Sequence, residues 1–138
     1  MRRTLANTVL ILLLTLFVQN LFAQKIAINN QSIAPEGFIA YDLGQYKKGK
    51  KQTLWLEIKN DSKKSLQIKS LELSCDCLSA SALPPMALPP GALYRLKIIH
   101  KAKDIGSFQT FIIVRSDAQN HPELWLKLNG EVLKKKSK

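Results

Sequence analysis

Residues 53–60 read T-L-W-L-E-I-K-N, and apolar side chains recur at every second position of this stretch. Leu54, Leu56 and Ile58 fall on one side of the chain, while Trp55 falls on the other. Successive side chains of a β-strand point to opposite faces of a sheet, so a period of two indicates a strand with one buried face. The stretch therefore predicts a β-strand that lies on a hydrophobic core.

The same period recurs along the chain beyond residue 24, where no helical period is found. Turn residues interrupt it about every ten residues, which is typical of the strands of a two-layer sandwich. The predicted fold class is all-β, an immunoglobulin-like β-sandwich of about seven strands. The predicted strand segments are 38–43, 53–60, 66–68, 71–73, 94–98, 108–114 and 124–128, after which Gly130 and Val132 lead to the basic tail.

Four features carry more detailed predictions. Gly44 and the lysines after it are expected to end the first strand and turn the chain. The alternation changes phase near Lys69 and Ser70, which predicts a β-bulge or a crossing between sheets. Residues 108–114 are almost wholly apolar, so this strand is expected to be covered on both faces. Residues 82–91 are rich in proline, which has no amide proton for a sheet, and are expected to form a connection.

The N-terminal segment has the layout of a cleaved secretory signal peptide. Arg2 and Arg3 precede an apolar run of about ten residues, whereas a membrane-spanning helix needs about 20. Ala23 is a small residue suited to cleavage. We therefore expect a periplasmic or secreted protein with no membrane span after cleavage. The expected organisation is a signal peptide at 1–23, an N-terminal lead-in at 24–36, the sandwich domain at 37–133 and a basic tail at 134–138.

The chain is strongly basic, with 21 Lys and Arg against 10 Asp and Glu and a net charge of +11. The densest group of lysines is Lys47, Lys48, Lys50 and Lys51. A field of this sign favours an anionic partner, either an envelope protein or an anionic surface polymer. Nucleic acid is also anionic and would bind a surface of this charge, but it is not the expected partner of an exported protein. The alternative is that these lysines are solvated and keep the protein soluble.

The two cysteines of the chain occur in S-C-D-C-L, residues 74–78. If the alternation continues from Leu71 and Leu73, Cys75 and Cys77 point toward the core or its rim. A disulfide between them requires a bend at Asp76, because two strand residues span about 6.6–6.8 Å and disulfides tolerate at most about 6.8 Å. The pair is thus interpreted as buried thiols or a local disulfide.

Two other roles of the cysteine pair stay open. Cu(I) accepts thiolate and thioether ligands, so Cys75 and Cys77 are candidate copper ligands, with Met86 as a possible third. The pair is also a candidate for thiol exchange, which needs thiols that a partner can reach. His100 and His121 have no sequence neighbours that would make them ligands or bases, and both are expected in loops or at the rim.

The remaining motifs point away from catalysis. There is no Ser-His-Asp order, no Gly-rich phosphate loop and no His-Glu-x-x-His motif, so the sequence predicts neither an enzyme nor a cofactor apart from the copper alternative. Trp55 and Trp125 alternate with the inward-facing leucines of their strands, so their side chains are expected on the opposite face of each strand. They are expected to be partly covered aromatics or anchors of an interface.

An ordered series of motifs resembles one family. The motifs are Y-D-L-G-Q-Y-K-K-G-K, L-E-I-K-N-D-S, S-L-Q-I-K-S-L-E-L-S-C-D-C, L-P-P-G, G-S-F-Q-T-F-I-I-V-R-S-D and L-K-L-N-G-E-V, in that order. This series is similar to the bacterial envelope proteins of domain-of-unknown-function family 1573, over roughly Gly37 to Leu133. The resemblance implies an immunoglobulin-like sandwich related to ciliary and centrosomal modules of the Hydin type. Asp76 and Leu78 replace the glycine and threonine of the family's usual Ser-Cys-Gly-Cys-Thr.

The sequence and the resemblance together predict an exported, non-catalytic immunoglobulin-like domain that acts as a protein- or envelope-interaction module. The alternative is a copper(I)-binding or thiol-redox protein that uses Cys75, Asp76 and Cys77.

Overall fold

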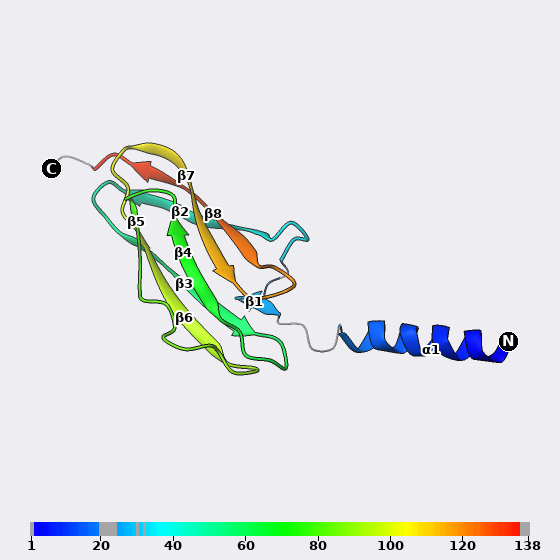
Figure 1. Ribbon diagram of the computed structural model, residues 1–138. Coiled ribbons are helices and arrows are strands. Elements are labelled where there is room, and N and C mark those ends of the chain that lie inside the picture. The colour runs from blue at the N-terminus through cyan, green and yellow to red at the C-terminus, as the bar shows by residue number, and fades with distance from the viewer. Residues whose placement is uncertain (1, 20–24, 30, 32, 136–138) are drawn as a thin grey trace.

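Two four-stranded β-sheets face each other in the computed structural model, which describes residues 2–19, 25–29, 31 and 33–135 (Figure 1). The elements are α1 (Arg2–Gln19), β1 (Ile26–Ile28), β2 (Phe38–Lys47), β3 (Gln52–Asn60), β4 (Ile68–Leu73), β5 (Leu78–Ala80), β6 (Leu93–His100), β7 (Gly106–Ser116) and β8 (Glu123–Leu133). The predicted all-β sandwich is confirmed.

The strands have the order β1-β3-β6-β5 in the first sheet and β2-β8-β7-β4 in the second. All pairs are antiparallel except β2 and β8, which run parallel. The edge strands are therefore β1 and β5 in one sheet, and β2 and β4 in the other. The chain passes from the second sheet to the first between β4 and β5.

The core lies between the sheets and follows from the alternation seen at residues 53–60. Leu56 and Ile58 are fully buried, whereas Trp55 on the opposite face is 52% exposed. Each fully buried aliphatic side chain of this kind contributes about 1.5–3 kcal/mol. The core residues are Ile26, Ile28, Ile39, Leu56, Ile58, Leu66, Ile68, Leu78, Leu88, Leu96, Ile98, Ile112, Val114, Ala118, Leu124, Leu126 and Leu128.

The phase change at Lys69 and Ser70 is confirmed as an irregularity in the pairing of β4 with β7, between Ile68 and Ser70. The expected coverage of residues 108–114 on both faces is found only at 112–114, which are all buried. It was wrong for the first part of the strand, where Gln109 is exposed and Phe111 is half-buried on the outer face of the sheet. The proline-rich segment 82–91 forms a connection with one isolated bridge, from Leu88 to Leu66.

The first strand is longer than predicted. Gly44 does not end it, because β2 continues to Lys47 with a register shift between Asp42 and Gln45. Gly44 has a φ of +68°, which glycine adopts without steric cost, and it absorbs this irregularity within the strand. As a result Tyr46 is buried instead of lying in a loop.

The expected lead-in at 24–36 contains a strand of the sandwich. β1 pairs with β3, and Ile26 and Ile28 are 2% and 0% exposed. Asn120, in the loop between β7 and β8, exchanges two hydrogen bonds with the backbone of Ile26. The domain therefore begins before Gly37, and a strand of three residues was too short to reveal its period in the sequence.

The N-terminal helix α1 covers Arg2–Gln19. Among the described residues, no helix combines the length and apolar character needed to cross a membrane. The predicted cleavage point after Ala23 lies outside the described residues, as do residues 136–138 of the basic tail. The signal peptide stays a prediction.

Candidate functional site

A disulfide closes the turn between β4 and β5, where the chain passes from the second sheet to the first. Cys75 and Cys77 are bonded, and their Cα atoms are 5.1 Å apart. An extended strand would hold these atoms about 6.6–6.8 Å apart, so a bend at Asp76 brings them within bonding range. Both cysteines are half-buried and pack against the core. We call residues 75–77 the disulfide corner.

Backbone hydrogen bonds hold the disulfide corner on both sides. Before it, the Ser74 amide donates to the Phe111 carbonyl (3.0 Å), and the Phe111 amide donates to the Ser74 hydroxyl (2.8 Å). After it, the Lys101 amide donates to the Cys77 carbonyl (2.8 Å), and the Leu78 amide donates to the Cys75 carbonyl (3.3 Å). The turn is thus anchored to β7 and to the end of β6 by contacts that do not involve sulfur.

A hollow of about 340 Å³ lies against the disulfide corner. Its walls come from the corner itself, the connection between β6 and β7, and the start of β7. The lining residues are Cys75, Asp76, Cys77, His100, Ala102, Lys103, Asp104, Ile105, Gly106, Ser107, Phe108 and Thr110. Within the described part of the chain, the buried Thr110 hydroxyl has no hydrogen-bond partner. A buried hydroxyl normally has one, so this group is an exception among the buried polar atoms of the described residues.

His100 is 2% exposed, so its prediction as a loop or rim histidine was wrong. Its Nδ1 atom shares a short hydrogen bond with the Tyr46 hydroxyl, and its ring stacks on Phe108 with centroids 4.2 Å apart. Burial lowers the pKa of His100. Burial raises the pKa of Tyr46, an effect partly offset by the Ala102 backbone hydrogen bond to its hydroxyl.

Burial disfavours the charged form of each ring, so His100 and Tyr46 are both neutral near pH 7. One hydrogen bond joins Nδ1 of His100 to the Tyr46 hydroxyl in the wall of the hollow.

An ion pair lies at the outer side of the hollow. The Lys103 ammonium contacts the Asp76 carboxylate, and both side chains are exposed. The hydrogen bond from Lys103, followed by its charge, lowers the pKa of Asp76. The negative charge beside the two sulfurs is thus offset by a positive one.

The topology gathers lysines at the end of the sandwich that holds the disulfide corner (Figure 1). The Lys48 amide donates to the Leu133 carbonyl (2.9 Å), which places the turn after β2 beside the end of β8. Gln52 pairs with His100, which places the start of β3 beside the connection after β6. We call this the lysine-rich end; its exposed lysines are Lys47, Lys48, Lys50, Lys51, Lys101, Lys103, Lys134 and Lys135.

The sequence singled out Lys47, Lys48, Lys50 and Lys51, and the structure places all four exposed at this end. The turn that carries them is closed by the Lys50 amide, which donates to the Lys47 carbonyl (3.0 Å). The sequence could not indicate that the other four lysines meet them, because pairing between distant strands brings the groups together.

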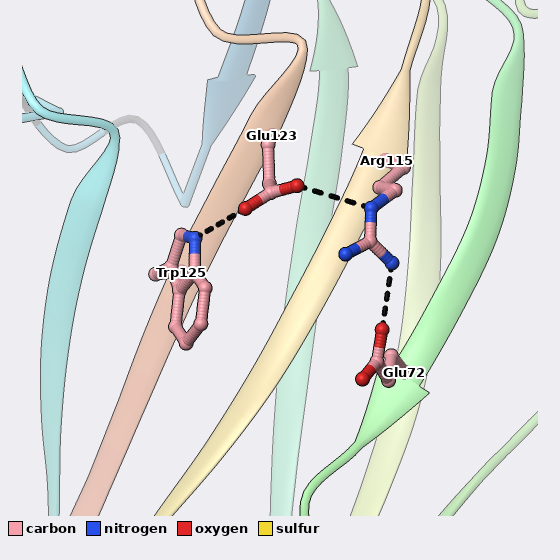
Figure 2. Close-up of polar contacts among 4 residues, drawn as sticks. All are labelled: Glu72, Arg115, Glu123 and Trp125. Carbon is pink, nitrogen blue, oxygen red and sulfur yellow. Dashed lines mark hydrogen bonds and ion pairs between the residues drawn. The ribbon is translucent and has the colours of Figure 1, made fainter.

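The outer face of the second sheet carries a different cluster, shown in Figure 2. Arg115 of β7 donates to Glu123 of β8 (3.0 Å) and to Glu72 of β4 (2.7 Å). The Trp125 indole donates to the other oxygen of Glu123 (2.7 Å) and meets the edge of Phe111. Hydrogen bonds to the two carboxylates raise the pKa of Arg115. Since two carboxylates neutralise one guanidinium, this face attracts anions less than the lysine-rich end does.

The remaining candidates are dispersed. Trp55 lies on the outer face of the first sheet, with the Lys97 ammonium 5.7 Å from the centre of its ring. Met86, the possible third copper ligand, is 75% exposed and does not line the hollow. His121 is half-buried beside Gly37. Across the described ranges, no group of three or more His, Cys, Asp or Glu residues could hold a metal ion. A bonded cysteine pair offers no thiolate to copper, so copper binding stays a prediction for the reduced protein.

Comparison with known proteins places this arrangement in a family. The model of a protein family of unknown function, DUF1573, matches residues 39–132. The chain belongs to the DUF1573 family. The family predicted from the motif series is therefore confirmed, and the matched segment of this DUF1573 chain includes the disulfide corner and the hollow. No curated protein matches the sequence.

Solved structures share the fold of this DUF1573 chain at low sequence identity. A Porphyromonas gingivalis protein of unknown function has a TM-score of 0.62 and 19% identity, over 80% of this chain and 48% of that one. The Vibrio cholerae protease VesB has a TM-score of 0.57 and 12% identity, over 67% of this chain and 30% of VesB. The ASH/PapD-like domain 7 of human CEP192 has a TM-score of 0.54 and 13% identity, over 83% and 89%. The chain thus spans about half of the Porphyromonas protein and under a third of VesB.

Proposed function

We propose that this protein is an exported, non-catalytic immunoglobulin-like module of the bacterial envelope, periplasmic or secreted, that binds an anionic partner through its lysine-rich end. The observation that carries the proposal is the convergence of three lysine groups, far apart in sequence, on one end of the sandwich. The proposed partner is an anionic surface polymer or an acidic envelope protein.

The charge balance of this end supports the proposal. Two carboxylates line the hollow at this end, Asp76 and Asp104, against the eight exposed lysines, and Asp76 is already paired with Lys103. Charges that lie within a Debye length of about 8 Å reinforce one another at physiological salt. A surface of one sign raises the local concentration of oppositely charged partners and speeds their association.

The fold comparison is compatible with an interaction role and brings no catalytic activity. The aligned part of VesB is 30% of that chain, and at 12% identity the likeness concerns the fold alone. The CEP192 match, which covers 89% of a single ASH/PapD-like domain, agrees with a complete sandwich module.

Matched lysine pairs test the proposal. Lys50→Gln/Lys51→Gln removes two charges from the lysine-rich end, while Lys63→Gln/Lys64→Gln removes two charges beside Asn60, at the opposite end of β3. Binding of the full chain to a phosphorylated glycolipid surface is measured at about 0.05 M and about 0.5 M NaCl. A lysine near an anionic surface contributes about 1 kcal/mol, so the first pair is expected to weaken binding about tenfold to thirtyfold.

The control pair is expected to change the affinity by less than about twofold, and high salt should weaken every variant. Equal losses in both pairs would show that net charge, and not this end, governs binding. If the glycolipid does not bind, a photo-crosslinker at position 50, with position 63 as its control, tests for an acidic envelope protein. Failure of both arms refutes the proposal.

A further inference from the structure

We propose that Cys75 and Cys77 form a thiol–disulfide exchange site, in which the oxidised chain accepts two electrons from a protein dithiol while the fold stays intact. This activity is separate from the proposed anion binding. Four features of the disulfide corner and its hollow support it.

The first feature is that the turn does not depend on its disulfide. Hydrogen bonds from Lys101 and Leu78, and the reciprocal pair between Ser74 and Phe111, fix the backbone on both sides. A bridge across so short a loop removes little entropy from the unfolded chain, because the entropy removed by a disulfide grows with the length of the loop that it closes. Reduction should therefore leave Cys75 and Cys77 side by side, ready to be oxidised again.

The second feature is access. Both cysteines are half-buried, and both line the hollow, so the bond is not sealed inside the core. Exchange requires a thiolate to approach one sulfur of the disulfide. The hollow at the end of the sandwich gives a route for that approach. The alternation in the sequence did not indicate this hollow, because it predicted only that the two sulfurs point toward the core or its rim.

The third feature is charge. The sulfur that leaves does so as a thiolate, and neighbouring cations favour the thiolate form of a cysteine. Lys103 and Asp76 both line the hollow and are paired, so their charges offset each other beside the sulfurs. The adjacent positive charge that this pair leaves over belongs to Lys101, whose amide donates to the Cys77 carbonyl.

The fourth feature is the Thr110 hydroxyl. Thr110 lines the same hollow, and its buried hydroxyl has no partner among the described residues. An unpaired buried hydroxyl destabilises the folded state. Donation to a thiolate formed in the hollow would satisfy it, so this threonine is assigned as a group that stabilises the reduced or reacting state.

The electrons and protons balance as follows. A thiolate of the partner dithiol attacks one cysteine sulfur, the S–S bond breaks, and the other cysteine leaves as a thiolate that takes up a proton. The second thiol of the partner loses its proton and attacks the mixed disulfide, which releases the first cysteine as a thiolate that takes up that proton. The partner ends as a disulfide, and Cys75 and Cys77 end as two thiols.

Dithiothreitol is the probe for the first experiment on the purified full chain. Free thiols are counted by maleimide mass labelling after acid quenching, while the tryptophan bands of the near-ultraviolet circular dichroism spectrum follow the fold, since the disulfide itself contributes at shorter wavelengths. The expected result is two labelled thiols per chain with unchanged tryptophan bands. The variant Cys75→Ser/Cys77→Ser should fold in the same way. Thiols that become available only as the native spectrum is lost would overturn the proposal.

The isosteric variant Thr110→Val separates exchange from stability. Removal of an orphaned buried hydroxyl should stabilise the fold or leave it unchanged. If the hydroxyl assists the leaving thiolate, reduction by dithiothreitol should nevertheless slow by about threefold to tenfold, as expected for the loss of one hydrogen bond to developing charge. The control is Thr53→Val, since Thr53 is exposed on β3. Equal exchange rates in Thr110→Val and wild type would refute a site built by the hollow.

Discussion

The imidazole of His100 is buried against Phe108 and Tyr46, so its protonation opposes folding. Sequence inspection could not reveal this, because a histidine at the end of a strand precedes a polar connection and resembles a loop residue. The enclosure depends on Tyr46, which faces inward only because the irregularity at Gly44 changes the phase of β2.

The stability of the protein should depend on His100 in a defined pH range. The pKa of this histidine is lowered in the folded state, whereas an unfolded chain has a value of about 6.5. The unfolded state thus binds more protons below about pH 6.5, and the free energy of unfolding should fall as the pH drops toward the folded pKa. Urea denaturation between about pH 8 and about pH 5 measures this slope.

His100→Gln should lower stability at pH 8 but reduce the slope, because Gln does not titrate. Thr53→Val is the control, since it replaces an exposed residue of β3 and removes no titratable group, so it should keep the wild-type slope. A slope that is unchanged in His100→Gln would mean that other groups produce it.

Gly37 and Gly49 provide a matched test of backbone strain. Both have positive φ, +73° and +86°, so alanine at either position costs about 1–2 kcal/mol. A Cβ at Gly37 would also lie 2.8 Å from the Glu123 carbonyl oxygen, whereas a Cβ at Gly49 meets nothing within 4 Å. Gly37→Ala should therefore lower the free energy of unfolding by about 1–3 kcal/mol more than Gly49→Ala does. Urea unfolding checks the difference, and equal losses would contradict the crowding at β8.

At the level of the elements, strands of six residues or more could be predicted and the two strands of three residues could not. The alternation in β3, β6 and β8 is long enough to predict which face of each strand is buried, and these predictions are confirmed. β1 and β5 each offer a single alternation, which is indistinguishable from a loop. Their pairing partners, β3 and β6, are what define them as strands.

The strand β1 should contribute substantially to stability although it is short. Ile28 is fully buried, and Ile28→Ala is expected to cost about 2–5 kcal/mol. Ile105→Ala is the control, since Ile105 is 53% exposed and should change stability by less than about 0.5 kcal/mol. Thermal and urea unfolding of the full chain measure both. A loss at Ile28 no larger than that at Ile105 would mean that the sandwich folds without β1.

For the whole molecule, the candidate site arises from long-range pairing. The cysteine pair and the lysine clusters were visible in the sequence, and so was the need for a bend at Asp76. Their common location was not, because it depends on β5 pairing with β6 and on β2 running parallel to β8. The hollow and the unpaired Thr110 hydroxyl likewise follow from packing between distant segments.

The lysine-rich end should also reduce stability through repulsion between like charges. Lys50→Gln/Lys51→Gln is expected to raise the melting temperature at low ionic strength. The corresponding gain in the free energy of unfolding should be less than about 1 kcal/mol. The gain should shrink at about 0.5 M NaCl, because salt screens exposed charges. Differential scanning calorimetry at both salt concentrations measures it, with Lys63→Gln/Lys64→Gln as the control. A gain that persists in high salt would have a cause other than repulsion.

The direction of β8 has a practical consequence. This strand finishes at Leu133, beside the turn that carries Lys47 and Lys48, while β1 enters the sandwich at the opposite end, next to Asn120. A purification tag or sensor linker attached after the last residue would therefore crowd the surface proposed to meet its partner. Tethering the protein from the side that precedes β1 leaves that surface unobstructed, and an affinity that rises when the tether is moved there would be consistent with contact at this end.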